Sequence, residues 1–371
     1  LGHDEREAMD GKRILIVDDV ISTGGSLHAL ETLAAKSTGT VVGCCAALAE
    51  GDAAKRLNVY NYSDYIAEDT IANFEAATGI KVTYDVFDSD ETVAAKMLAG
   101  DSRHGVVVPT LNFFGRQIEA GVFLPLDKAK IPNLANLDPD IMARIAGQDP
   151  GNMYGVPYMI GTTGIGYNAT KLAERFGEDT QIGNSWDLVF KPENIAKMKD
   201  CGVTLLDTPA DMLPIALHYL GLDPHSGDEA DLNKAAELLK SIRPYVQNFH
   251  SSQYVSSLAN GSTCLVVGWS GDIIQARDRA AEAGNGVEVV YSIPVEGAPQ
   301  WFDMLAIPRD AKNPDSAYAF IDYLLQPQVA ANNTNFIQYA NPVKSATALV
   351  DEAIRTDATI YPAADVAAKM Y

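Results

Sequence analysis

The chain has 371 residues, and this length favours at least two structural units because single hydrophobic cores rarely grow beyond about 250 residues. Apolar residues make up 47% and charged residues 21%, which is typical of a folded globular protein and excludes a disordered or fibrous one. The 49 acidic and 28 basic residues give a formal net charge of −21, which excludes nucleic acid and anionic membranes as expected partners because both attract cationic surfaces. No apolar run approaches about 18 residues, so we expect no insertion into a membrane.

The first 56 residues have the pattern of one β–loop–α–β unit. The apolar run Ile14–Val17 predicts a strand that is buried on both faces of a parallel sheet. Residues 22–26 then interrupt the chain, a helical pattern covers residues 27–36, and a second strand is expected at residues 40–48. We therefore treat residues 1–56 as a unit of their own.

Two acids and a glycine-rich loop follow the first of these strands. Backbone N–H groups at a helix N-terminus form a cradle for phosphate, glycines let the phosphate approach, and carboxylates can accept hydrogen bonds from ribose hydroxyls. The candidate loop comprises Asp18, Asp19, Thr23, Gly24, Gly25 and Ser26. Together with residues 48–56, the stretch 14–26 closely resembles the phosphoribosyl-pyrophosphate signature of purine phosphoribosyltransferases.

That resemblance ends at Arg56. Phosphoribosyltransferases need further strands, a hood that holds the base and a flexible loop over the pyrophosphate, and a segment of 56 residues has no room for them. We interpret residues 1–56 as a phosphoribosyltransferase-like fragment that carries a binding loop without forming an enzyme. The alternatives are a phosphoribosyltransferase-related enzyme or phosphoribosyl-pyrophosphate-binding module fused to an amine sensor, or a segment with no function.

From Leu57 onward, strand and helix patterns alternate, which indicates an α/β fold with largely parallel sheets. Strands are expected at residues 57–60, 81–87, 105–109, 263–269 and 286–294, and helices at residues 67–78, 91–99, 191–198, 228–245 and 315–325. Gly79 is expected to end the first of these helices in a left-handed conformation. Within the glycine-rich stretch 158–168, residues 161–166 are expected to form a strand turn near a crossover between two parts of the fold.

Three clusters combine aromatic rings with an acid, and each lies in or after a predicted strand. They are Asn61–Tyr65, Gly268–Asp272 and Trp301–Asp303. Ligands of open α/β sheets bind beyond the carboxyl ends of the strands, where such clusters meet. Carboxylates bind ammonium groups, and aromatic rings flank methylenes and attract cations, so this combination predicts a site for a linear amine.

Residues 57–371 resemble a bacterial polyamine-binding protein, the putrescine/spermidine receptor of an ABC importer. The stretches that carry the resemblance are 61–67, 84–89, 107–110, 120–123, 163–168, 249–252, 258–261 and 339–341. The resemblance implies a type II periplasmic-binding-protein fold, in which two lobes are joined by a hinge and close on a ligand in the cleft. It places residues 57–160 and 301–371 in lobe 1 and residues 161–300 in lobe 2.

The resemblance also implies a role for each residue of the cleft. Asp64, Asp272 and Asp303 would hold the ammonium groups, Tyr62, Trp269 and Trp301 would stack along the alkyl chain, and Ser63, Thr110, Ser251 and Tyr339 would supply polar contacts. Cys201 and Cys264 match the family's disulfide. The implied function is capture of putrescine or spermidine in the cleft and delivery to an ABC permease, without catalysis.

Four positions depart from the family's usual residues. Tyr62 replaces a tryptophan, Thr110 replaces a serine, Ala210 falls where an acid is common, with Asp211 beside it, and Gly105 replaces an aspartate. The first three lie near the expected cleft, so the preference between putrescine and spermidine stays open.

The remaining expectations concern partners and location. The six histidines have no metal-ligand spacing, no nucleophile motif is present, and we expect neither a metal nor a cofactor. We expect a monomer in the periplasm, as the resemblance implies. The first ten residues have no apolar core of a signal peptide, and members of the family run somewhat past the position of Tyr371.

Overall fold

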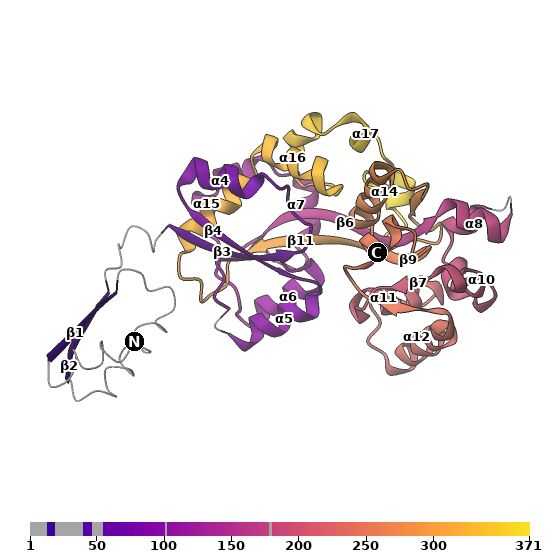
Figure 1. Ribbon diagram of the computed structural model, residues 1–371, viewed down its shortest axis with the longest axis horizontal. Coiled ribbons are helices and arrows are strands. Elements are labelled where there is room, and N and C mark those ends of the chain that lie inside the picture. Colours follow the sequence, from indigo (N-terminus) through magenta and orange to yellow (C-terminus); the bar gives the residue numbers. More distant parts are fainter. Residues whose placement is uncertain (1–12, 19–39, 47–54, 101, 178–179) are drawn as a thin grey trace, which may run out of the picture. The chain divides into compact units, whose positions relative to one another are not determined.

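The computed structural model describes residues 13–18, 40–46, 55–100, 102–177 and 180–371 (Figure 1). It divides into two compact units, Leu1–Arg56 and Leu57–Tyr371, which are described separately.

In the first unit, strands β1 (Arg13–Asp18) and β2 (Thr40–Ala46) pair in parallel. Both strands confirm the prediction from the apolar runs. The predicted helix at residues 27–36 lies outside the described residues, as does the phosphate loop after Asp18, which is the last residue of β1.

The second unit is built on a nine-stranded mixed sheet with the strand order β4-β3-β5-β11-β6-β9-β7-β8 and with β10 paired to β6. Its strands are β3 (Arg56–Tyr62), β4 (Lys81–Phe87), β5 (Val106–Val107), β6 (Gly155–Asn168), β7 (Val203–Leu205), β8 (Asn248–Phe249), β9 (Leu265–Trp269), β10 (Val289–Ser292) and β11 (Gln300–Ala306). The pairs β3–β5, β7–β8 and β7–β9 are parallel, whereas β6 pairs antiparallel with β9, β10 and β11. The α/β fold class is therefore confirmed, with antiparallel strands in the middle of the sheet.

Strand β6 connects the two lobes of this unit. Its first half pairs with β11, and its second half, from Thr163 onward, pairs with β9 and β10. The predicted turn at residues 161–166 is therefore wrong, because these residues lie inside one uninterrupted strand. Packing explains the glycines: a Cβ atom on Gly161 would lie 2.3 Å from the Trp301 ring, and one on Gly164 would lie 2.5 Å from the Ser292 carbonyl oxygen.

Helices cover the sheet on both sides of this crossover (Figure 1). Lobe 1, around β3, β4, β5 and the first half of β6, carries α4 (Thr70–Thr78), α5 (Asp90–Ala99), α6 (Leu111–Glu119), α7 (Pro139–Ile145) and α15 (Pro314–Leu324). Lobe 2, around β7, β8, β9 and β10, carries α8 (Ala169–Phe176), α9 (Asp187–Phe190), α10 (Pro192–Met198), α11 (Pro209–Tyr219), α12 (Glu229–Ile242), α13 (Tyr254–Ala259) and α14 (Ser270–Ala283). The chain ends through α16 (Pro327–Ile337), α17 (Glu352–Arg355) and α18 (Ala364–Ala367). The predicted left-handed end of α4 is confirmed, since Gly79 has φ 71°.

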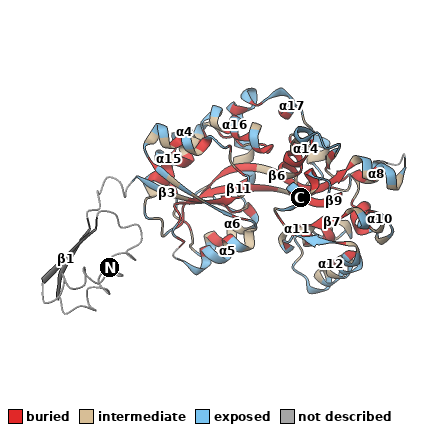
Figure 2. Cartoon of the chain, in the orientation of Figure 1, coloured by how far each residue is buried: buried red, intermediate tan, exposed pale blue. Residues whose placement is uncertain are grey.

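The core of each lobe lies between the sheet and the inner faces of these helices. Figure 2 shows β6, β9 and β11 buried along most of their length, whereas the helices alternate buried and exposed faces. The largest side chains that are fully buried include Phe74, Phe114, Phe123, Trp186, Phe190 and Phe320. In the ranges described by the structure, no helix is long and apolar enough to cross a membrane.

The C-terminal segment packs on residues of lobe 2. The Tyr371 N–H donates to the Ala298 carbonyl oxygen (3.3 Å), and the Tyr371 carbonyl accepts from the Gln300 N–H (2.9 Å). The Tyr371 ring also lies 4.3 Å from the His218 ring. We therefore propose that the lobe boundaries fall within β6 and after Gln300, the first residue of β11, as expected, but that the last residues of the chain belong to lobe 2 rather than lobe 1.

The predicted disulfide between Cys201 and Cys264 is confirmed, with a Cα–Cα distance of 5.5 Å. It closes a loop with a sequence separation of 63, for which the chain-entropy relation gives about 4 kcal/mol of stabilisation. We expect replacement of both cysteines by serine to lower the free energy of unfolding by roughly this amount in denaturant titrations. Reduction of the unmodified protein should reproduce the loss, and an unchanged midpoint under reducing conditions would contradict the prediction.

Candidate ligand-binding site

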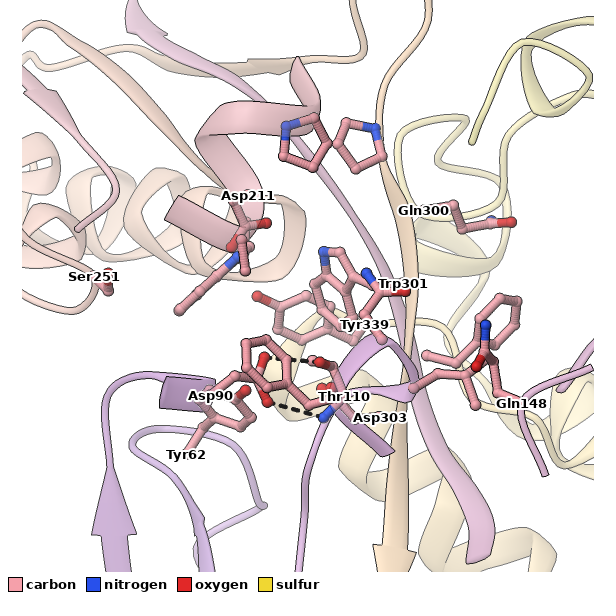
Figure 3. Close-up of a pocket in the computed structure, with 18 of the residues that line it drawn as sticks. Tyr62, Asp90, Thr110, Gln148, Asp211, Ser251, Gln300, Trp301, Asp303 and Tyr339 are labelled. Carbon is pink, nitrogen blue, oxygen red and sulfur yellow. Dashed lines mark hydrogen bonds between the residues drawn. The ribbon is translucent and has the colours of Figure 1, made fainter. Parts of the chain in front are cut away.

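A cavity of about 370 Å³ lies between the two lobes, and residues from both of them line it (Figure 3). It opens beyond the ends of β3 and β9, as expected for a ligand site at the edge of an α/β sheet. Its acids are Asp88, Asp90, Asp211, Asp272 and Asp303, and its aromatic residues are Tyr62, Tyr65, Phe113, Trp269, Trp301, Phe302, Tyr339 and Tyr371.

Aromatic rings from the two lobes meet in this cavity. Tyr62, at the end of β3, makes an edge-on contact with Trp269, at the end of β9, with ring centroids 5.8 Å apart. Trp301 on β11 lies 5.4 Å from the Tyr339 ring. Rings in this arrangement offer apolar faces to a methylene chain and negative potential to a cation.

Asp272 is held by two tyrosines. It lies in the first turn of α14, where the helix dipole favours a negative charge. Its Oδ2 accepts a hydrogen bond from the Tyr254 hydroxyl (2.8 Å), and its Oδ1 accepts one from the Tyr339 hydroxyl (2.8 Å). Burial nevertheless raises the pKa of Asp272 to about 6. Gly271 makes this arrangement possible, because a Cβ atom there would lie 2.3 Å from the Tyr339 ring.

Asp303 is the most deeply buried acid of the cavity, with 2% of its surface exposed. Its Oδ2 accepts a hydrogen bond from the Tyr65 hydroxyl (2.6 Å), whereas its Oδ1 has no hydrogen-bond partner in the part of the chain that the structure describes. Burial, with a further contribution from Asp90 and Asp211, raises the pKa of Asp303 well above its ordinary value. A buried carboxylate oxygen without a partner is costly, so a cationic donor in the cavity would stabilise it.

Asp90 and Asp211 are cavity acids that the sequence analysis did not assign to the site. Asp90 is the first residue of α5, and it accepts hydrogen bonds from the Thr110 N–H (3.0 Å) and hydroxyl (2.8 Å), drawn as dashed lines in Figure 3. Asp211 lies in the first turn of α11 and accepts from the Thr163 hydroxyl (2.8 Å). Burial raises the pKa of Asp90 to about 7 and that of Asp211 to about 6.

Of the ten ligand-binding residues predicted from the sequence, nine line the cavity. They are Tyr62, Ser63, Thr110, Ser251, Trp269, Asp272, Trp301, Asp303 and Tyr339. Asp64 is not a lining residue. It occupies a turn with φ 52°, its carboxylate is 58% exposed, and it forms an ion pair with Arg279 at 3.1 Å. This conformation turns the side chain towards Arg279 of α14, and Asp64 is the predicted ligand-binding residue that does not line the cavity. We therefore propose that Asp64 does not hold an ammonium group.

We expect Asp64→Asn to change ligand affinity by less than about threefold, because exposed ion pairs contribute little. Isothermal titration calorimetry of the variant against the unmodified protein measures this. Arg279→Gln is the matched control, since it removes the other half of the same pair. A loss of affinity comparable to that of an Asp272 variant would restore Asp64 to the site.

One strong cation lines the cavity among the described residues. Arg144 on α7 donates a hydrogen bond to the Gln300 side chain (2.7 Å), and its guanidinium carbon lies 4.9 Å from the centre of the Phe302 ring. In Figure 3, Gln148 and Gln300 lie on the opposite side of Trp301 from Asp211 and Ser251. The cavity is therefore acidic at one side and amide-lined at the other. Within the described ranges, no group of three or more histidine, cysteine or acidic side chains has a geometry that holds a metal ion.

The family of bacterial extracellular solute-binding proteins matches residues 69–362, which is most of the chain. The chain belongs to this family. The putrescine-binding periplasmic protein SpuD of Pseudomonas aeruginosa (strain UCBPP-PA14) is 52% identical over 332 residues, 90% of each chain. The putrescine-binding periplasmic protein PotF of Escherichia coli (strain K12) is 50% identical over 338 residues, 90% of this chain and 91% of the relative.

A solved structure agrees with the two-lobed architecture. The spermidine/putrescine ABC transporter substrate-binding protein PotD from Streptococcus pneumoniae superposes with a TM-score of 0.67 at 28% identity, and the match covers 85% of this chain and 92% of that one. The type II fold predicted from the sequence is thus confirmed.

The N-terminal part has a second, shorter similarity. The phosphoribosyl transferase domain family matches residues 3–84, so the similarity extends past Arg56, where the sequence analysis ended it, and overlaps the solute-binding match at residues 69–84. The overlap begins in the β3–α4 region, whose strand–helix order is common to both α/β folds. The candidate phosphate-binding residues Asp19, Thr23, Gly24, Gly25 and Ser26 lie outside the described part of the chain.

Proposed function

We propose that this chain is a polyamine-binding protein that captures putrescine or spermidine between its lobes and delivers it to an ABC permease. The observation that carries the proposal is the interlobe cavity, in which buried carboxylates surround a box of aromatic rings and one oxygen of Asp303 has no partner within the described residues. Relatives that are at least half identical to the chain are named as putrescine-binding periplasmic proteins, and this supports the ligand class.

The chemistry of the cavity matches a linear amine at both ends and along its length. A hydrogen bond between an ammonium and a carboxylate contributes about 1.5–3 kcal/mol, and each buried methylene contributes about 0.8 kcal/mol. Two such contacts and four methylenes give roughly 6–9 kcal/mol before the entropy of association is subtracted, and micromolar binding requires about 8 kcal/mol. This sum leaves little free energy to offset the entropy of association, so we expect contacts to further carboxylates and rings to contribute to the affinity as well.

The mechanism is capture by lobe closure, and we propose no catalytic step. Ligand would contact Asp303 and Tyr339 on one side of the cleft and Asp272 and Trp269 on the other, so that it stabilises the closed arrangement of the lobes. We propose the periplasm as the location, as the names of the relatives support, and a monomer as the working form.

Calorimetric titration of the purified chain with putrescine and then with spermidine tests this function. We expect saturable one-to-one binding with a dissociation constant in the micromolar range or below. The free amino acids alanine and glutamate, which lack a second ammonium group, are the negative-control ligands in the same titration. The absence of binding heat and of any thermal stabilisation with either amine would overturn the proposal.

A further inference from the structure

Three of the cavity's carboxylates lie together at one end, on three different elements. Thr110, which donates two hydrogen bonds to Asp90, forms a β-bridge with Asp303, so these two acids flank the same residue. The first turn of α11, which carries Asp211, is joined to α5 across the cleft by a hydrogen bond from the Thr208 hydroxyl to Glu91 (3.3 Å). Asp90, Asp211 and Asp303 therefore meet where α5, α11 and β11 converge.

The three acids have no cation between them, and one of their oxygens has no protein partner in the described ranges. Arg144, the one lysine or arginine among the described lining residues, is engaged by Gln300 and Phe302 instead. Asp303, with 2% exposure, presents its free Oδ1 among residues that line the cavity. An unpartnered buried carboxylate oxygen beside two further acids is the feature that a cationic ligand would satisfy.

Two of the residues that depart from the polyamine-binding pattern converge on Asp90. Thr110 donates to it through both its N–H and its hydroxyl, and the neighbouring Tyr62 interacts electrostatically with it. A tryptophan at position 62 would have no hydroxyl to offer. Thr110 thus holds the Asp90 carboxylate in place at the wall of lobe 1, next to Tyr62.

The fourth buried acid of the cavity, Asp272, lies on a different element, α14. The charged groups that act on Asp272 are Asp64 and Arg279, not the three acids at the Asp90 end. A diamine that spans both ends would bring one ammonium group to Asp272 and one to the three acids. This leaves the Asp90 end with more negative charge than the ligand neutralises.

We propose that Asp90, held by Thr110 beside Tyr62, is a further cation-binding residue, and that the Asp90–Asp211–Asp303 end holds two cationic nitrogens of one ligand. The cavity then prefers a triamine such as spermidine to a diamine such as putrescine. This inference rests on the proposed function and specifies its ligand.

Calorimetric titration of the full chain with spermidine and putrescine tests the inference. For the unmodified protein we expect spermidine to bind at least about tenfold more tightly, the ratio that one additional charge-assisted contact provides. Asp90→Asn keeps the size of the side chain and removes its charge, so we expect it to weaken spermidine by about tenfold or more and putrescine by less than about threefold. Asp140→Asn is the matched control: it makes the same charge change in the first turn of another helix of lobe 1, at an exposed residue that does not line the cavity, and should alter neither affinity by more than about twofold.

A second variant covers the case in which Asp90→Asn unfolds. Tyr62→Phe removes only the hydroxyl of the tyrosine that neighbours Asp90, and we expect it to lower the ratio of spermidine to putrescine affinity by about threefold. Putrescine that binds as tightly as spermidine, or an Asp90→Asn variant that weakens both amines equally, would overturn the inference and leave the proposed function intact. Failure of both amines to bind would instead overturn the proposed function.

Discussion

Removal of the charge of Asp272 is expected to weaken amine binding by about 10- to 150-fold, the equivalent of a charge-assisted hydrogen bond of about 1.5–3 kcal/mol. Asp272 lines the cavity and accepts hydrogen bonds from Tyr254 and Tyr339, of which Tyr339 is also a lining residue. Loss of the carboxylate leaves one ammonium group of the ligand in a buried place without a counter-charge. The effect should therefore appear with diamines and triamines alike.

The choice of substitution decides whether the measurement reports binding or folding. Asp272→Ala would leave the hydroxyls of Tyr254 and Tyr339 without their acceptor, and each lost partner in a buried place costs about 1–3 kcal/mol of stability. Asp272→Asn keeps one acceptor oxygen and the volume of the side chain. We expect it to reduce affinity with only a small shift in thermal midpoint, whereas the alanine variant should lose both affinity and stability.

Trp269→Ala is the companion variant, because it removes the ring that meets Tyr62 across the cleft. We expect a loss of at least about tenfold, since both apolar contact and cation attraction disappear. Asp140→Asn, at an exposed residue that does not line the cavity, again serves as the control. Affinities of Asp272→Asn and Trp269→Ala within about twofold of the unmodified protein would show that the ligand lies elsewhere.

The aromatic and acidic clusters could be predicted from the sequence because each lies at a strand end or on a strand. An α/β fold brings such ends to one edge, so Tyr62, Trp269 and Trp301 could be placed in one site without knowledge of the packing. Asp64 was misplaced for the opposite reason. It sits next to a true lining residue, and the left-handed turn that points it at Arg279 has no marker in the sequence.

Asp90 and Asp211 were missed because their positions depend on helix orientation. Both are first-turn acids, which ordinarily serve as exposed partners of the helix dipole, and only the packing of α5 and α11 turns them into the cleft. The resemblance pointed to Ala210 as the position of a missing acid, and Asp211, one residue further along the helix, carries its carboxylate into the cavity. The sequence feature that could have drawn attention to this wall of the cavity is that Tyr62 and Thr110 both depart from the family's usual residues.

Strand β6 is a case in which tertiary packing overrides local propensity. Gly161, Gly164 and Gly166 each weaken an isolated strand, so the sequence predicted a turn. In the fold, Trp301 and Tyr291 occupy the space that side chains at Gly161 and Gly164 would need. This requirement for small residues becomes visible only when β6, β10 and β11 are paired.

Amine binding is expected to weaken by at least about tenfold when the pH falls from about 8 to about 5. Burial raises the pKa of Asp272 and Asp211 to about 6 and that of Asp90 to about 7, so these groups take up protons within this range. Ammonium groups titrate near pH 10 and stay charged throughout. A carboxyl that must lose its proton before it binds the ligand lowers the affinity about tenfold for every pH unit below its pKa. At about pH 5, Asp272 and Asp211 together would therefore lower the affinity by about a hundredfold.

The same linkage predicts that binding releases protons near neutral pH. Calorimetry in buffers of different protonation enthalpy counts these protons, and we expect a positive release that is smaller in Asp90→Asn. An affinity that stays constant from about pH 8 to about pH 5 would contradict the role of these carboxyls.

The stability of the ligand-free protein should fall as the pH rises, and a bound polyamine should counteract this fall. These acids have a higher pKa in the folded protein than the ordinary value of 3.8 that they have when unfolded, so the folded state binds more protons between about pH 4 and pH 7. The free energy of unfolding of the ligand-free protein therefore falls as the pH rises through this window, as the buried carboxyls become charged without a counter-ion. A bound polyamine supplies that counter-ion, so the thermal stabilisation by ligand should grow from pH 5 to pH 8. Asp90→Asn should flatten the decline in the ligand-free protein, because one of the charges that destabilise the closed cleft is then absent at every pH.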